Sequence, residues 1–366
     1  MGRWPLRSFA LLTLAAAAAA AVSCSAPAPQ PAKLAPVAAL AKPSLPPWIG
    51  SVSPLGKADT LAQIRVIFAK PLIAVQALSG DGPRGVLSHV RIEPALRGHF
   101  TVLTPRMIGF VADQALPTGT RVQVTLTAGL HDLTGDSLAD DLVWTFETDQ
   151  VEFTSLPSLT AIGDEGTPTP APLNPKIRIT SNAAVDTDSL ASHALLTDGK
   201  VRVSMTAALE VQPTPYPGSG AEELFNPALK TWVYDLQPSQ ELTRATRYRL
   251  KISPGVAPVY GNLPTTKEFY GELRTYGALT MVPTPLPSPN GDSRFAAGDP
   301  VIAFNNDLDA KSVVGAVTIS PAPASVKTLA VVQDYQRNAI SIDPYALDPN
   351  STYTATVGAG VKDVFG

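Results

Sequence analysis

The chain of 366 residues is 45% hydrophobic and only 16% charged. That composition excludes a chain that is disordered throughout and a coiled coil, because both carry many more charged residues. The 36 prolines favour short strands separated by turns over long helices, so an all-β fold is expected. The formal net charge is −3 and the Lys and Arg residues are scattered along the sequence, which argues against nucleic acid as a partner.

The first 23 residues have the organisation of an export signal peptide. Arg3 and Arg7 precede an apolar stretch from Phe9 to Val22, which is shorter than the roughly 20 residues that a membrane-spanning helix needs. The stretch ends at Ala21–Cys24, which resembles a bacterial lipobox, although leucine is commoner than alanine at its first position. The resemblance implies that cleavage leaves Cys24 as the new amino terminus, with a lipid attached to its thiol.

Cys24 is also the only cysteine in the chain. An exported protein has little use for one unpaired cysteine, so we expect lipid attachment there. The alternative is cleavage after an Ala-x-Ala site, with Cys24 discarded or left as a free thiol. A triacylated Cys24 would hold the protein on the cell membrane or the outer membrane, facing the periplasm or the exterior. Residues 24–47 then form an Ala/Pro-rich linker, expected to be a solvated, extended tether.

The rest of the chain contains one pattern three times. In each copy a leucine precedes an alternating strand, and the strand enters a turn that is bounded by two glycines six positions apart. Glycine adopts backbone angles that other residues resist, and the apolar residue after the first glycine can tuck beneath the turn. The copies are Leu116, Thr120–Leu126 and Gly129–Gly135; Leu242, Thr246–Ile252 and Gly255–Gly261; and Leu347, Thr352–Val357 and Gly360–Gly366.

Each copy also predicts an early strand and a central strand, and the first two predict a closing strand. The early strands are expected at Ile64–Phe68, Ile177–Ile179 and Val301–Phe304, the central ones at Met107–Val111, Trp232–Tyr234 and Ala339–Ile342, and the closing ones at Trp144–Thr148 and Phe269–Thr275.

The fold class expected is therefore all-β, with tandem immunoglobulin-like Greek-key β-sandwiches at 48–150, 151–276 and 277–366. The last sandwich is expected to be truncated, because the third copy shows no closing strand. Since natural proteins avoid an open sheet edge, the sequence is expected to be part of a longer protein. The short joints at Asp149–Thr154 and Tyr276–Leu279 predict limited movement between neighbouring sandwiches.

The first copy carries a family resemblance. Phe68–Leu72, Ile92–Phe100, Leu116–Gly135 and Trp144–Thr148 resemble the bacterial Ig-like module of the surface-layer type. The Pro-x-Leu-x-Gly pattern within the second of these segments is similar to the amino-terminal region of bacterial alpha-2-macroglobulins, large lipoproteins that trap proteases. The similarity is good over 48–150, fair over 225–275, and confined to strand and turn patterns in 277–366.

The resemblance implies the amino-terminal scaffold of an endopeptidase inhibitor anchored at the bacterial envelope. Family members let a protease cut a bait region and then collapse around it, and many carry a Cys-x-Glu-Gln thioester. This sequence contains neither, so proteases would be met through carboxy-terminal domains that are missing from it. An alternative function, for which the repeated Ig-like pattern is sufficient evidence, is a tandem Ig-like surface lipoprotein that acts as a spacer or an adhesin.

No catalytic residue, metal ligand or cofactor is expected, and the chain is not expected to be an enzyme. The sequence lacks a Gly-x-Ser-x-Gly elbow, a phosphate loop and a dinucleotide fingerprint. The histidines have no metal-ligand spacing to one another, so surface or structural roles are expected for them. They are His89, His99, His131 and His193.

Three further groups of residues have alternative interpretations. A cluster of aspartates after Gly129 could bind calcium, but aspartate also suits turns because it caps backbone amides. The tryptophans at strand-like positions are expected in the core rather than on a sugar-binding surface. The long insertion Gln212–Pro227 is the best candidate for an exposed binding loop, with plain disorder as the alternative. The aspartates are Asp132, Asp136, Asp140 and Asp141, and the tryptophans are Trp48, Trp144 and Trp232.

Overall fold

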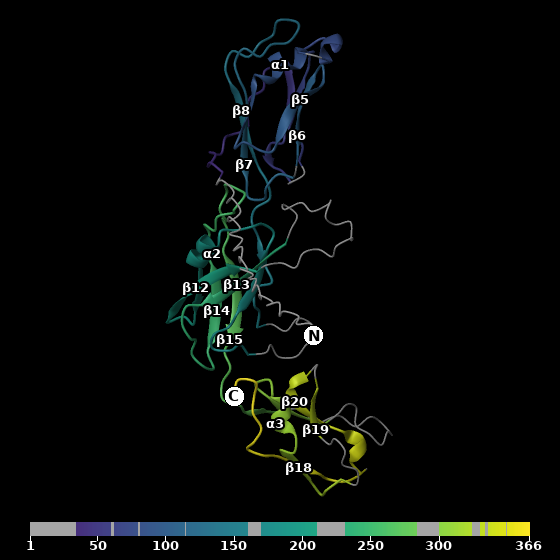
Figure 1. Ribbon diagram of the computed structural model, residues 1–366, viewed down its shortest axis with the longest axis vertical. Helices are drawn as coiled ribbons and strands as arrows, with labels where there is room; N and C mark the ends of the chain where they lie inside the picture. Colours follow the sequence, from purple (N-terminus) through teal and green to yellow (C-terminus); the bar gives the residue numbers. More distant parts are fainter. Residues whose placement is uncertain are drawn as a thin grey trace, which may run out of the picture. The chain divides into compact units, whose positions relative to one another are not determined.

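The all-β, Ig-like fold predicted from the sequence is confirmed by the computed structural model (Figure 1). Three separate clusters of buried hydrophobic residues define three modules: module 1 from Trp48 to Thr148, module 2 from Val151 to Thr275, and module 3 from Leu279 to Gly366. None of the helices in the described part of the chain is long and apolar enough to cross a membrane. The described residues are 34–59, 62–79, 81–113, 115–159, 170–210, 231–283, 300–323, 330–333, 336–348 and 350–366.

Module 1 consists of two four-stranded sheets, in the orders β1-β3-β6-β5 and β2-β8-β7-β4. This is the arrangement of the Ig constant-type sandwich, with one added strand, β2, that runs parallel to β8. Helix α1 (Gly82–Leu87) lies in the connection from one sheet to the other. The strands are β1 Ile49–Ser53, β2 Gly56–Lys57, β3 Arg65–Phe68, β4 Val90–Glu93, β5 Gly98–Thr104, β6 Met107–Ala112, β7 Arg121–Leu126 and β8 Leu142–Glu147.

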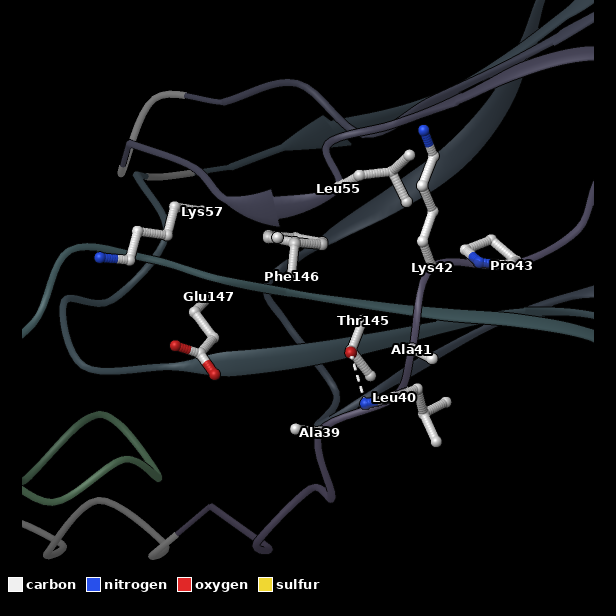
Figure 2. Close-up of a pocket in the computed structure, with 11 residues that line it drawn as sticks. Ala39, Leu40, Ala41, Lys42, Pro43, Leu55, Lys57, Thr145, Phe146 and Glu147 are labelled. Carbon is white, nitrogen blue, oxygen red and sulfur yellow. Dashed lines mark hydrogen bonds between the residues drawn. The ribbon is translucent and has the colours of Figure 1, made fainter.

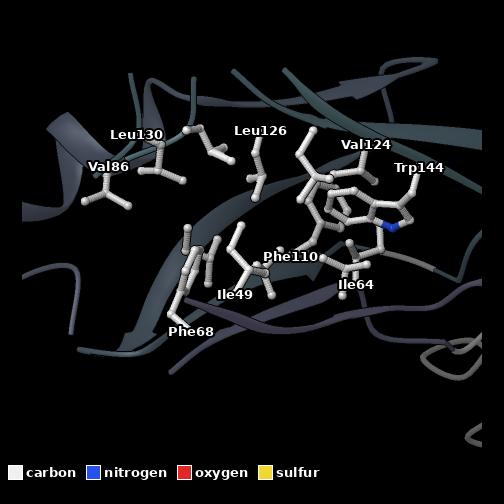
Figure 3. Packing of buried hydrophobic residues seen from close by; sticks show 14 of the residues in the cluster. Ile49, Ile64, Phe68, Val86, Phe110, Val124, Leu126, Leu130 and Trp144 are labelled. Atoms are coloured by element: carbon white, nitrogen blue, oxygen red, sulfur yellow. The ribbon is translucent and has the colours of Figure 1, made fainter. Parts of the chain in front are cut away.

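The core of module 1 follows from the period-2 alternation of its strands. Along β7, Val122, Val124 and Leu126 are fully buried, while the residues between them face outward and are half-buried. Trp144 from β8 and Phe68 from β3 lie between the two sheets with them (Figure 3). Each sheet therefore contributes one apolar face to a common core.

Module 2 repeats this arrangement with one difference. Its sheet order is β15-β14-β11-β12-β13-β10-β9, because the long strand β12 pairs with β11 through residues 202–204 and with β13 through residues 205–209. Helix α2 (Thr187–His193) occupies the place of α1. The strands are β9 Phe153–Thr154, β10 Ile177–Ser181, β11 Ala194–Thr197, β12 Arg202–Leu209, β13 Trp232–Pro238, β14 Arg247–Ile252 and β15 Phe269–Arg274.

Module 3 has a four-stranded sheet of order β16-β17-β20-β19 and a two-stranded sheet of β18 and β21 in its described residues. Its short helix α3 (Ala310–Val313) corresponds to α1 and α2. The counterpart of β8 and β15 is not found among these residues. The strands are β16 Met281–Val282, β17 Val301–Phe304, β18 Val317–Ser320, β19 Ala330–Gln333, β20 Gln336–Ile342 and β21 Thr354–Val357.

The three glycine-bracketed turns have like surroundings, as predicted. In each, the fourth residue after the first glycine donates a backbone hydrogen bond to the loop that follows the early strand. The residue after the first glycine is fully buried in modules 1 and 2 and half-buried in module 3. The bonds run from Leu133 N to Pro71 O (2.9 Å), from Val259 N to Ala184 O (2.8 Å) and from Val364 N to Asp307 O (3.0 Å).

The outer edges of β8 and β15 are both covered by the segment that joins the first two strands of the same module. In module 1 this segment is β2, and Ala58 N donates to Glu147 O at 2.8 Å just beyond it. In module 2, Glu272 N donates to Pro157 O at 2.7 Å, and Ala171 forms a parallel bridge with Thr275.

Candidate functional site

Residues from module 1, module 2 and the proline-rich segment meet at Asn262. Its side-chain oxygen accepts a hydrogen bond from Arg121 N at 2.7 Å, and its amide nitrogen donates to Arg121 O at 3.0 Å and to Ala35 O at 2.9 Å. Its backbone N–H donates to Gly119 O at 3.0 Å. One side chain therefore forms hydrogen bonds with backbone groups from two other parts of the chain.

The two modules approach each other closely at two glycines. A Cβ placed on Gly261 would lie 2.3 Å from Gly119 O, which is much closer than a van der Waals contact. Gly119 itself has a φ of +69°, and a Cβ there would meet Val151 and Leu263. Gly261, unlike Gly119, has no positive φ. The closing glycine of the second turn is thus needed for close backbone approach rather than for its backbone angle.

The described part of the proline-rich segment is bound to module 1. Arg121 donates from its guanidinium to Val37 O at 2.9 Å while it pairs with Glu147 at 2.6 Å, and both side chains are about three-quarters buried. Leu40 N donates to Thr145 Oγ1 at 3.1 Å. Residues 34–47 have no helix or strand, yet at these positions they are held against the outward face of β7 and β8.

This segment and β2 enclose a groove of about 510 Å³ over β8, in which Lys42, Lys57 and Glu147 are the charged side chains (Figure 2). The lining contains no serine, histidine or cysteine. Apart from Thr145, the rest of the lining is apolar or backbone. The groove is lined by Ala39, Leu40, Ala41, Lys42, Pro43, Leu55, Gly56, Lys57, Thr145, Phe146 and Glu147.

The same asparagine contact holds the chain at both module junctions. Asn182, directly after β10, accepts from Glu152 N at 2.9 Å and donates from its amide to Gln150 O at 3.0 Å. Asn305, directly after β17, accepts from Thr280 N at 2.8 Å and donates to Ala278 O at 2.8 Å. Each junction is thereby tied to the module that follows it.

A stacked aromatic pair links module 2 to module 3. The rings of Tyr276 and Phe365 are parallel to within 7°, with centroids 4.1 Å apart, and the Arg244 guanidinium lies 5.1 Å from the Tyr276 ring centre. Nearby, the buried Asn306 amide donates to Gly277 O at 2.9 Å and to Asp363 Oδ2 at 2.6 Å. The third turn therefore also contributes to a junction.

Two features that the sequence singled out for function lie outside the described residues. These are Cys24 and the insertion Gln212–Pro227. The described histidines lie apart, and three have local partners: His89 contacts Thr127 Oγ1 at 3.0 Å, His131 contacts Gly129 O, and His193 contacts Ser189 O. The described residues contain no group of three or more His, Cys, Asp or Glu side chains that could hold a metal.

Asp132 and Asp141 accept hydrogen bonds from backbone amides near the turn, as the second of the two interpretations describes. Asp132 is buried and accepts from the backbone N–H groups of Thr134 and Asp136 at 2.7 and 3.1 Å. Burial alone raises the pKa of Asp132, but these hydrogen bonds outweigh it and hold the pKa below its usual range. Asp136 pairs with Lys70 at 2.6 Å, and Asp141 accepts from Ala128 N at 2.8 Å.

Trp48 and Trp144 are core residues, as expected. Trp144 has no exposed surface, and Trp48 stacks on Phe68 with centroids 5.7 Å apart. Trp232 is only half-buried and lies 6.4 Å from the Tyr260 ring. The junction residues Asn182, Asn262 and Asn305 were missed, although an asparagine directly after an early strand in two copies is a signal that the sequence contains.

Comparisons with known proteins agree with this architecture. A family model described as a bacterial Ig-like domain matches residues 285–366. The chain is 41% identical over 341 residues to the alpha-2-macroglobulin homolog of Nostoc sp., and this covers 91% of the present chain but 18% of that protein. The chain thus spans about a fifth of the relative's length.

Among solved structures, alpha-2-macroglobulin from Escherichia coli spanning domains MG0-NIE-MG1 is similar, with 13% identity and a TM-score of 0.22 over 86% of this chain and 96% of that one. L,D-transpeptidase 3 from Mycobacterium tuberculosis is similar at 16% identity and a TM-score of 0.20, over 47% of this chain and 50% of that one. With TM-scores this low, neither structure supports a conclusion about this chain. The relationship of the chain to known proteins therefore rests on its sequence identity to the Nostoc protein. The chain is homologous to a segment of an alpha-2-macroglobulin homolog, and the resemblance seen in its first Ig-like module is confirmed.

Proposed function

We propose that this chain is the amino-terminal scaffold of an alpha-2-macroglobulin-like endopeptidase inhibitor, anchored at the bacterial envelope through a lipidated Cys24. The observation that carries the proposal is the 41% identity to an alpha-2-macroglobulin homolog over nearly the whole chain. The described residues support a scaffold role, because three sandwiches follow one another and each junction is held by side-chain and backbone hydrogen bonds. Protease trapping itself would belong to the rest of the protein.

Trapping is tested with the complete protein encoded at this locus. The complete protein is mixed with an endopeptidase, and cleavage of a large protein substrate and of a short peptide is followed. A trap blocks cleavage of the large substrate and leaves the peptide accessible, because only small molecules reach an enclosed protease. Residues 24–366 alone should leave both activities unchanged. Unimpaired cleavage of the large substrate by every endopeptidase tried would instead favour the spacer or adhesin.

Anchoring is tested separately by growing cells with labelled palmitate. The wild-type protein should carry the label and sediment with membranes, whereas Cys24→Ala should do neither. Label that persists in Cys24→Ala would refute attachment at this residue and leave the scaffold role untouched.

A further inference from the structure

The outward face of one sheet of module 2 gathers basic side chains from three strands. Along β14, Arg247, Arg249 and Lys251 alternate with buried core residues. They stand opposite Arg274, Glu272 and Tyr270 of β15 in the register of the two strands. Arg202 of β12 pairs with Thr197, which in turn pairs with Arg249. We call this surface the basic face; its residues are Arg202, Arg247, Arg249, Lys251, Glu268, Tyr270, Glu272 and Arg274.

The basic face keeps a positive excess after its internal ion pairs are counted. Glu272 is shared by Arg247 and Arg249, and Glu268 pairs with Lys251 at 2.5 Å. Hydrogen bonds from these basic partners hold the pKa of both glutamates below the usual range, so both carboxylates are charged at neutral pH. Arg202 and Arg274 are exposed and make no ion pair with any described residue. Five basic groups thus face two acidic ones, on a chain whose net charge is −3.

The sandwich itself does not need this charge, as the equivalent faces of the other modules show. In module 1, the face of β2, β8, β7 and β4 carries Lys57, Arg91 and Arg121 against Glu93 and Glu147, an excess of one. In module 3, the face of β18 and β21 presents only threonine and serine. Its outward residues are Thr318, Ser320, Thr354 and Thr356.

The other half of the module 2 sheet, around β10 and β13, is balanced. There Lys176 and Arg178 pair with Asp235 and Glu210. Of these four faces, only the basic face therefore carries an excess of three positive charges.

An aromatic side chain lies within the basic face. Tyr270 is 51% exposed, and Arg249 and Lys251 lie 5.9 and 6.0 Å from its ring centre. Next to it is a groove of about 480 Å³, to which Leu156 and Pro157 contribute apolar surface. Exposed tyrosine beside basic residues is the combination found where proteins meet the headgroup region of a bilayer.

We propose that the basic face binds the surface of a bilayer that contains anionic lipids. The side chains project from one sheet face, so several can reach a plane of headgroups together, and each Lys or Arg near such a surface adds to the attraction. An excess of three charges predicts a preference of about a hundredfold for anionic over neutral bilayers at low salt, weakening as salt screens it. The inference does not require the proposed anchor, although a lipid on Cys24 would raise the local concentration of the face at the membrane.

The test uses the chain from residue 24 with Cys24→Ser, which removes any covalent lipid, and vesicles of phosphatidylcholine with or without phosphatidylglycerol. The double variant R202E/R274E reverses two charges that make no ion pair, so its thermal unfolding should match wild type while its binding to anionic vesicles falls at least about tenfold. E272Q removes a carboxylate from the same face and should bind several-fold tighter. R84E/R91E changes the net charge equally on exposed positions of module 1 and should bind like wild type.

Equal binding of wild type to both kinds of vesicle would overturn the proposal, and so would an equal loss in R84E/R91E. If R202E/R274E unfolds at a lower temperature than wild type, the E272Q variant is used instead. Tighter binding of E272Q to anionic vesicles supports membrane binding by the basic face, and unchanged binding refutes it. Binding to a polyglutamate peptide without binding to anionic vesicles would assign the face to an acidic protein instead and would also overturn it. Failure of the protease-trap experiment leaves all these outcomes unaffected.

Discussion

The α-carbon of Gly261 faces the carbonyl oxygen of Gly119 so closely that a Cβ would lie 2.3 Å from that oxygen. Because the obstacle is backbone, it cannot rotate away as a side chain would. We expect Gly261→Ala to destabilise the chain by about 1–3 kcal/mol, measured by chemical denaturation, and to increase proteolysis near Asp149. Gly360→Ala, where nothing lies within 4 Å of the added Cβ, is the control and should change stability little. Equal effects of the two changes would contradict this reading of the junction.

A threonine at the end of the closing strand joins two turns in modules 1 and 2. Thr148 Oγ1 donates to Pro117 O at 2.6 Å and accepts from Thr120 N at 2.9 Å. In the same way, Thr275 Oγ1 donates to Thr243 O at 2.6 Å and accepts from Thr246 N at 3.0 Å.

Valine keeps the shape of threonine but leaves the amide and the carbonyl, which are buried or partly buried, without this partner. Thr148→Val and Thr275→Val should therefore each cost about 1–3 kcal/mol of unfolding free energy. Thr206→Val, on the exposed side of β12, should be close to neutral. Loss in Thr206→Val as large as in the other two would show that the hydroxyl contacts are not the cause.

Much of each sandwich could be predicted from the sequence, because an alternating strand that ends in a glycine-bracketed turn determines which residues face the core. The short helices were missed, since four to seven residues are too few for a helical period, although α2 and α3 begin after capping aspartates, Asp186 and Asp309. Strand pairing could not be predicted either. Arg247, Arg249 and Lys251 form a visible alternation, but Arg202 and Arg274 reach the same face only through the register of β12 and β15. The Lys and Arg residues that looked scattered are thus gathered by topology.

The hydroxyl of Tyr248 accepts a hydrogen bond from Thr243 N at 3.0 Å, five residues earlier, and Tyr353 accepts the same bond from Asp348 N at 2.9 Å. This is the tyrosine corner of Ig-like sandwiches. Tyr248 is 2% exposed, so Tyr248→Phe removes a partly buried hydrogen bond to the Thr243 amide and should cost about 1–2 kcal/mol in thermal or chemical unfolding. Tyr353 is half-buried, and water can replace its hydroxyl, so Tyr353→Phe should cost clearly less. The opposite order would contradict the argument.

The ion pairs of Asp235 make the free energy of unfolding depend on pH in the acid range. Burial alone raises its pKa, but Lys176 at 2.6 Å and Arg178 at 3.4 Å outweigh burial and hold the pKa below its usual range. A depressed native pKa gives stability that is present above the unfolded-state pKa of about 3.9 and is lost as pH falls through the native value.

Asp235→Asn should therefore lower stability at neutral pH by about 1–2 kcal/mol and make the decline below about pH 4 shallower than in wild type. The cost stays modest because Lys176 and Arg178 are 56% exposed and remain solvated. Denaturant unfolding of both proteins across this pH range measures the difference. Parallel curves would show that Asp235 does not contribute to the pH dependence.

In modules 1 and 2 the outer edge of the closing strand is covered by backbone of the same module. Strand β2 pairs with β8, and Pro157 and Ala171 pair with the outer edge at β15. A strand whose outer hydrogen-bonding groups are already taken gives no template to another molecule. In these two modules the outer side of the closing strand is therefore not available for another chain to extend the sheet, which lowers the tendency of neighbouring tandem sandwiches to aggregate or swap strands there.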